Sequence, residues 1–191
     1  TALALLTGVP AAIGLAGAGF RGRSLIMAAL LSPMIVPIVI TAVAVYFFFV
    51  EIGLTGTYLG LILAHAMLGA PFVVITVAAT LENFDPAMLR AAASLGATPL
   101  TAFRRVMLPL ILPGVAAGGL FAFATSFDEI VVALFLAAPD QRTLPRQIFS
   151  GVREYVSPAI AAVAVLLLLV SSTLLATVTL LRRRAARLQG K

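Results

Sequence analysis

The sequence contains no cysteine, a single histidine and a single lysine. Without cysteine, the chain forms no disulfide and offers no thiolate ligand to a metal ion. His65 cannot build a histidine-based metal site alone, so we expect no metal and no other cofactor. A phosphate-binding loop of the G-x-x-x-x-G-K-[ST] type is excluded, because the only lysine is Lys191 at the end of the chain. Any ATP used in the protein's work must therefore bind to another chain.

Charge is also scarce. Charged residues make up 10% of the chain and hydrophobic residues 62%, and the mean hydropathy is +1.14. Soluble domains are about half apolar and about a quarter charged. The composition therefore predicts an integral membrane protein. The net charge of +6 does not indicate a nucleic-acid partner, because the arginines lie at the ends of apolar stretches, where they set membrane orientation and meet anionic lipid.

Five apolar stretches reach the length of about 20 residues that a membrane-spanning helix needs. In order, they are residues 1–19, 25–50, 57–81, 110–138 and 157–181. The sequence thus predicts an all-α polytopic membrane helical bundle with five visible transmembrane helices, forming one transmembrane domain over residues 1–191. The chain begins at Thr1 inside an apolar run, without the basic segment of a signal peptide, so we expect a truncated N-terminus.

Lysine and arginine are distributed unequally between the two ends of these stretches. If residues 21–23, 82–109 and 182–191 share one side, that side carries all but three of the basic residues. The exceptions are Arg142, Arg146 and Arg153. Because positive residues favour the cytoplasmic side, residues 82–109 are predicted to form a cytoplasmic loop.

The loop 82–109 is predicted to form two short helices with a bend between them. Asp85 and Thr98 each precede a proline, and a capping side chain followed by proline is typical of a helix start. Gly96 lies between the two predicted helices and can adopt the left-handed conformation that ends a helix. The pattern fits a hairpin lying on the lipid headgroups and equally a docking element for a soluble cytoplasmic partner.

The second predicted helix is amphipathic. Leu100, Phe103 and Met107 are spaced to share one stripe along it. Arg104 and Arg105 project elsewhere.

The hairpin also carries a sequence pattern. Its members are Ala91, Ala92, Gly96, Ala97, Phe103, Leu108 and Pro109. This pattern resembles the EAA loop of ABC-importer permeases, in which E-A-A-x-x-x-G is followed by an apolar tail ending in L-P. The family's glutamate position is occupied by Arg90. The resemblance implies that the hairpin carries the coupling helix, which docks in a cleft of the ATPase subunit.

Three further segments resemble the permeases for spermidine and putrescine: FRGRSLI at 20–26, SFDEIVVALFL at 126–136 and TLPRQIFSGVREYVSP at 143–158. The resemblance implies the type I importer fold and a multi-pass subunit of the bacterial plasma (inner) membrane that moves polyamines inward by alternating access. It implies cytoplasmic ATP-binding subunits, a second permease subunit and an extracytoplasmic substrate-binding protein as partners. ATP hydrolysis would then occur on a separate subunit, and this chain would not be an enzyme.

Two carboxylates, Asp128 and Glu129, lie in the fourth apolar stretch. Ionisable groups in membrane spans are costly and usually face a cavity or a partner. Asp128 and Glu129 are therefore predicted to line the solute path and to attract a cationic solute. Of the two, we expect Asp128 to face the path, because its shorter side chain is less able to reach outward, and Glu129 to pair or point to the outer surface. Ser126 would add a hydrogen-bonding hydroxyl. Alternatively, both carboxylates pair with arginines of the outer side, Arg142 or Arg153, or simply end the helix.

Other functions are compatible with parts of this pattern. The solute of an ABC permease could be another small molecule, and the chain could be a secondary transporter or channel that uses no ATPase. A membrane enzyme using His65 with Asp128 lacks a second histidine, a cysteine or a metal cluster to support it. His65 is instead expected to form a hydrogen bond across helices.

The predicted orientation can be tested directly, because the natural chain has no cysteine. We expect a Thr98→Cys variant to react with a membrane-impermeant thiol reagent only after the cells are opened. Labelling of this cysteine from outside intact cells would show that the orientation is inverted.

Overall fold

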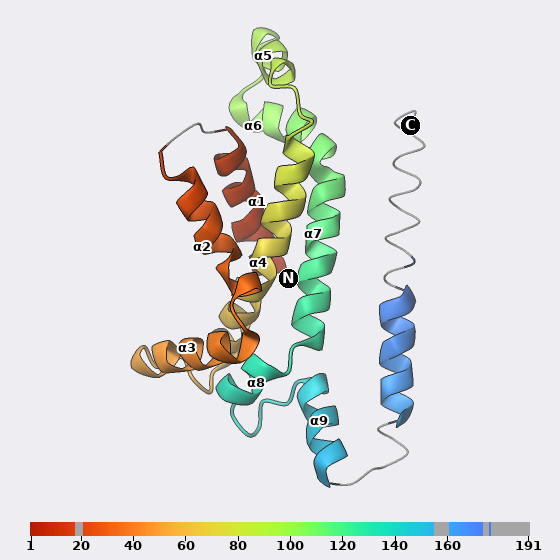
Figure 1. Cartoon of the computed structure of the whole chain (residues 1–191). Coiled ribbons are helices and arrows are strands. Elements are labelled where there is room, and N and C mark those ends of the chain that lie inside the picture. Colours follow the sequence, from red (N-terminus) through yellow and green to blue (C-terminus); the bar gives the residue numbers. More distant parts are fainter. Residues whose placement is uncertain (18–20, 155–160, 174–175, 177–191) are drawn as a thin grey trace. The chain divides into compact units, whose positions relative to one another are not determined.

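The computed structural model describes residues 1–17, 21–154, 161–173 and 176, and these residues form helices and connecting segments without a strand (Figure 1). In chain order the elements are α1 (Ala2–Gly17), α2 (Arg23–Ile35), α3 (Ile38–Glu51), α4 (Tyr58–Leu81), α5 (Ala87–Ser94), α6 (Pro99–Ala102), the π-helical segment η1 (Phe103–Met107), α7 (Leu108–Asp128), α8 (Val131–Leu136) and α9 (Leu144–Glu154). The predicted all-α class is confirmed.

Two helices in the described part of the chain are long and apolar enough to cross a membrane. They are α4 and the continuous helix Pro99–Asp128, which runs through α6, η1 and α7. Two shorter apolar helices cover Ala2–Gly17 and Ala161–Thr173. The predicted number of five spans is therefore not confirmed by helix length. The ends of the predicted fifth span and the basic tail lie outside the described residues, as do residue 20 and residues 155–158 of the quoted segments.

The predicted span 25–50 consists of two helices, α2 and α3, with a sharp bend between them. The two helices meet at an angle of 109°. Pro37 is extended, with φ −53° and ψ 133°, and a proline also disfavours helical geometry at the residue before it. Pro33, in contrast, lies inside α2. α2 and α3 are long and apolar enough to cross a membrane only if the bent pair is treated as one span.

The predicted span 110–138 is also interrupted. The helix ends at Asp128 and a short helix restarts at Val131. The two residues between them include Glu129, so one of the predicted path residues lies in the break itself.

Contacts divide the chain into two compact units. Unit 1 comprises Thr1–Leu31 and Gly69–Ala122, and unit 2 comprises Ser32–Leu68 and Phe123–Lys191. Both α4 and α7 contribute residues to each unit. Each unit has its own cluster of buried apolar side chains, centred in unit 1 on α1, α4 and α7 and in unit 2 on α3, α4 and α8.

Unit 1 depends on small residues that let helices approach closely. A Cβ atom added at Gly118 would lie 2.7 Å from the Cα atom of Val73, and one added at Gly114 would lie 2.7 Å from the carbonyl oxygen of Thr76. Two glycines four residues apart on one helix form the type of interface that brings membrane helices together. The Thr76 and Thr80 hydroxyls donate to carbonyls one turn earlier in α4, at 2.9 and 2.8 Å, so this contact leaves neither hydroxyl unsatisfied.

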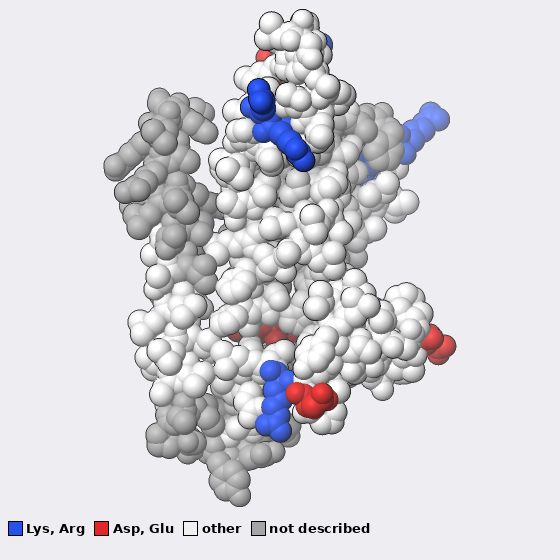
Figure 2. All heavy atoms as spheres, turned by 180° about the vertical axis from the view of Figure 1, so that it is seen from behind, with Lys and Arg blue, Asp and Glu red and all other residues white. Residues whose placement is uncertain are grey.

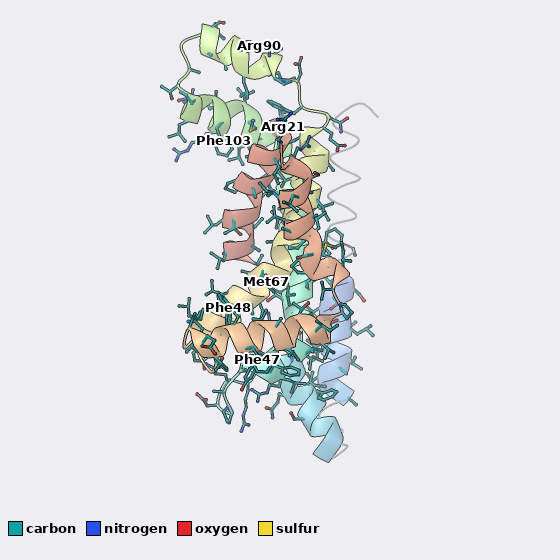
Figure 3. All side chains as sticks on the ribbon, turned by 60° about the vertical axis from the view of Figure 1, so that its left-hand side comes forward. Arg21, Phe47, Phe48, Met67, Arg90 and Phe103 are labelled. Atoms are coloured by element: carbon teal, nitrogen blue, oxygen red, sulfur yellow. The ribbon has the colours of Figure 1, made fainter. Side chains whose placement is uncertain are left out.

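Unit 2 is built around the packing of α3 against α8. Ala42 and Phe49 are buried together with Val132 and Leu136. The opposite face of α3 carries exposed aromatic side chains, including Phe47, which is 65% exposed (Figure 3).

Charged side chains occupy only a few places on the face of the molecule drawn in Figure 2. An apolar exterior of this kind suits contact with lipid tails.

The glycine contacts of unit 1 predict how the fold responds to one added methyl group. We expect Gly118→Ala to lower the free energy of unfolding by about 1–3 kcal/mol, because the new Cβ meets backbone that cannot move aside. The matched control is Gly14→Ala, where no atom lies within 4 Å of the added Cβ. Thermal melts followed by circular dichroism in detergent would compare the two variants. Equal stability in both would mean that the close approach at Gly118 is not required.

Candidate functional sites

The first helix of the hairpin begins as predicted. The Asp85 carboxylate accepts a hydrogen bond from the backbone N–H of Ala87 at 2.8 Å. Pro86 has helical angles, with φ −60° and ψ −17°, so proline occupies the position where its missing N–H has least effect. An aspartate and a proline therefore fix where α5 starts.

The turn after α5 is closed by two backbone hydrogen bonds around Gly96. The Gly96 N–H donates to the Ala93 carbonyl at 2.9 Å, and the Ala97 N–H donates to the Ala92 carbonyl at 3.0 Å. Gly96 has φ +80°, which confirms the predicted left-handed conformation. This arrangement is the Schellman motif. No atom lies within 4 Å of a Cβ added at Gly96, so glycine is required here by backbone conformation and not by space.

The second helix also starts as predicted but does not stop at the end of the loop. The Thr98 hydroxyl accepts from the Thr101 N–H at 3.3 Å. Leu108 and Pro109, predicted as the end of the loop, are the first two residues of α7. The wide π turn, in which the Leu108 N–H donates to the Phe103 carbonyl, immediately precedes Pro109, whose missing N–H already removes one α-helical hydrogen bond. The hairpin therefore runs directly into α7.

The predicted stripe is buried only in part. Leu100 is 57% exposed, whereas Phe103 and Met107 are half-buried. Met107 packs against the apolar cluster of unit 1. The π turn explains why a constant helical period does not describe this segment, because it adds a residue to one turn.

The hairpin presents a mixed apolar and basic surface. Figure 3 shows Arg90 on α5 and Phe103 on the helix beside it. Arg90, Arg104 and Arg105 are exposed and have no ion-pair partner among the described residues. Leu95, at the end of α5, is 89% exposed. The predicted contact residues of α5 also differ in exposure, since Ala91 is exposed and Ala92 is half-buried. This surface combines apolar and cationic groups around a glycine turn.

The two predicted path carboxylates have different environments. Asp128 is exposed at the last residue of α7. Glu129 is only 7% exposed, and its two carboxylate oxygens accept from the N–H groups of Val132 at 2.7 Å and Ala133 at 3.0 Å. A carboxylate in this position satisfies the free N–H groups at the start of α8 and suits the positive end of the helix dipole.

Glu129 also has a neighbour from another helix. His65 of α4 lies with Nε2 at 3.8 Å from Glu129 Oε2 and with Nδ1 at 2.8 Å from Ser126 Oγ. The expected cross-helix hydrogen bond of the histidine is confirmed. The acid near His65 is Glu129 and not Asp128, which the enzyme hypothesis had paired with it. Glu129 makes no ion pair with Arg142 within the described structure, and the Arg153 side chain lies outside it.

A second polar cluster was not predicted from the sequence. Gln141 is 4% exposed, and its side chain donates to the Gly56 carbonyl at 3.1 Å and accepts from the Ala138 N–H at 3.0 Å. Arg146 donates to the carbonyls of Ala138 and Gln141 at 2.9 and 2.8 Å. These contacts tie the loop before α4 to the loop after α8. No local sequence signal identifies them, because the partners of Gln141 lie far apart in the chain.

The described residues contain no group of three or more histidine, aspartate or glutamate side chains that could hold a metal ion. The two candidate sites are a hairpin with a preformed turn in unit 1 and a polar helix break in unit 2.

Comparison with known proteins identifies relatives of this chain. The chain is 36% identical over 163 residues to the spermidine/putrescine transport system permease protein PotC of Escherichia coli (strain K12), covering 85% of this chain and 62% of PotC. It is 34% identical over 172 residues to the putrescine transport system permease protein PotI of the same strain, covering 87% and 61%. It is 35% identical over 180 residues to the molybdenum transport system permease protein ModB of Mycobacterium bovis, covering 86% and 67%.

The chain thus spans less than two thirds of the length of PotC and PotI. A family model described as the binding-protein-dependent transport system inner membrane component matches residues 5–187. This match extends over both compact units and includes the hairpin and the helix break. The chain belongs to the family of inner membrane components of binding-protein-dependent transport systems.

Proposed function

We propose that this chain is the membrane-spanning permease subunit of an ATP-driven importer that moves polyamines into the cell. The observation that carries the proposal is the hairpin, a preformed turn with an exposed apolar and basic surface directly continuous with α7. A hairpin of this kind suits the docking of a soluble ATP-binding subunit, because its shape is fixed before the partner binds. The absence of an internal lysine excludes a P-loop in this chain.

The solute is assigned by the chemistry of the helix break together with the relatives. Spermidine and putrescine name the transport systems of two relatives, and both compounds are polycations. Asp128 supplies an exposed carboxylate, and a carboxylate in a membrane protein attracts cations. Ser126, one turn before Glu129 in the chain, adds a polar hydroxyl group. We assign Asp128 and Ser126 to the solute path, and Glu129 to the path's supporting structure.

The proposed mechanism is alternating access with the usual partners of such systems: two cytoplasmic ATP-binding subunits, a second permease subunit and an extracytoplasmic substrate-binding protein. ATP binding closes the ATP-binding subunits, which moves the docked hairpin. The helices then open toward the outside and receive the solute. ATP hydrolysis resets them toward the cytoplasm.

A permease for a different small solute is the second candidate. It is favoured by ModB, a relative of similar identity that is named for molybdenum. Uptake by proteoliposomes that contain the assembled importer separates the candidates, because ATP-dependent accumulation of labelled spermidine or putrescine supports the first. Flux without any ATP would instead indicate a secondary transporter or channel.

The hairpin's role can be tested at its turn. We expect Gly96→Val to strain the left-handed residue by about 1–2 kcal/mol and to misplace the second helix. Transport should fail while membrane insertion survives. Gly96→Asn is the matched control, because asparagine tolerates the left-handed region and the space around Gly96 is open. Co-purification of the ATP-binding subunit and uptake by Gly96→Val at the level of Gly96→Asn would contradict a docking role.

Substitution of each carboxylate in turn should distinguish their roles. We expect Asp128→Asn to raise the KM for polyamine uptake about tenfold, since it removes a charge-assisted contact. Glu129→Gln keeps one acceptor oxygen for the start of α8, so its main effect should be a loss of about 1 kcal/mol in stability. ATPase activity of the assembled complex should persist in both variants. Wild-type uptake in both would remove these carboxylates from the mechanism.

A further inference from the structure

His65 is a buried polar side chain that reaches from α4 to the break between α7 and α8. Its side chain is 11% exposed, and the facing Glu129 side chain is 5% exposed. Its Nδ1 atom bonds to Ser126 Oγ at 2.8 Å. Its Nε2 atom is buried without a hydrogen-bond partner and lies 3.8 Å from Glu129 Oε2. One imidazole ring therefore faces Ser126 in the last turn of α7 and Glu129 in the break, each with a different nitrogen.

The surroundings favour one arrangement of hydrogens on this ring. Both oxygens of Glu129 already accept backbone N–H groups, so the carboxylate presents negative charge to Nε2. A hydrogen on Nε2 is attracted to that charge, whereas a bare lone pair there would be repelled. In the neutral ring the other nitrogen, Nδ1, is then an acceptor. With this arrangement of hydrogens, the hydrogen in the 2.8 Å contact comes from Ser126 and not from the ring.

This arrangement sets the chemistry of Ser126. A serine hydroxyl has one hydrogen and two lone pairs. When its hydrogen is donated to His65, Ser126 Oγ presents only lone pairs to any further partner. An ammonium group has only donors, so it matches this oxygen.

We propose that His65 is a positioning residue that fixes the Ser126 hydroxyl as an acceptor for the ammonium groups of a polycationic amine, while its opposite edge faces the Glu129 cap of α8. The inference rests on the proposed function and deepens it. It assigns the selection of cationic donors to a histidine that does not itself touch the solute.

Two conservative substitutions test the two contacts of the His65 ring one at a time. In His65→Asn the amide oxygen stands near the place of Nδ1 and can accept from Ser126, but nothing reaches Glu129. In His65→Gln the amide stands near the place of Nε2 and faces Glu129, but the contact with Ser126 is lost. His65→Leu removes both contacts. Met67→Leu is the control, because it changes a nearby side chain of α4 that packs against the apolar cluster of unit 2 by a swap of similar volume.

The measurement is uptake of radiolabelled spermidine by proteoliposomes containing the complete importer, with ATPase activity recorded on the same preparations. We expect His65→Gln and His65→Leu to raise the KM about tenfold and His65→Asn to raise it less than about threefold. The maximal rate of ATP hydrolysis should stay near wild type in all three. Adding Ser126→Ala to His65→Leu should change the KM less than Ser126→Ala does alone, because both act through one hydroxyl.

The outcomes distinguish this inference from the function on which it rests. If the wild-type importer accumulates no polyamine with ATP, the proposed function fails and the role of His65 in selecting an amine fails with it. If the wild type transports spermidine and all three His65 variants share one KM, only the role of His65 is overturned. A fully additive double variant would overturn it in the same way. Met67→Leu should match the wild type, which shows that a KM change at His65 does not come from disturbed packing of α4.

Discussion

A backbone in lipid has no water to bond with, so every N–H and carbonyl must find a partner within the protein. This constraint governs where the polar side chains of the chain are used. At the break after α7, the Glu129 carboxylate takes up the free N–H groups of α8. At the bend before α3, the Pro37 carbonyl accepts from both the N–H and the hydroxyl of Thr41. Interrupted helices are possible here because, at each interruption, a carboxylate or carbonyl oxygen accepts hydrogen bonds from the N–H groups of the next helix.

The same constraint separates two neighbouring carboxylates that look equivalent in sequence. Glu129 is committed to the backbone of α8, and its exchange would affect structure first. Asp128 is exposed and forms no hydrogen bond or ion pair within the described structure. The carboxylate that is not used to hold the fold is therefore the one to which the proposed contact with a solute is assigned. Burial and hydrogen bonding, rather than side-chain length, decide between them.

Local features of the fold could be predicted from the sequence, whereas features that depend on packing could not. The helix starts at Asp85 and Thr98 and the left-handed Gly96 are encoded within a few residues, and the structure has them as predicted. Pro33 and Pro37 carry the same local signal, yet only Pro37 ends a helix. The meeting of His65 with Ser126 joins residues 61 positions apart, and no helical period within one segment indicates it.

At the Gly96 turn, the groups that set the backbone shape are different from the side chains that a partner could recognise. Its two hydrogen bonds join residues 92 to 97, and the space beside the glycine is open, so the geometry of the tip needs nothing from the outward-facing side chains around it. Those side chains, the exposed Arg90 among them, can change charge while the tip keeps its form. If the tip docks on a partner as proposed, complementary charges on the two proteins can therefore change one at a time while the shape of the contact is kept.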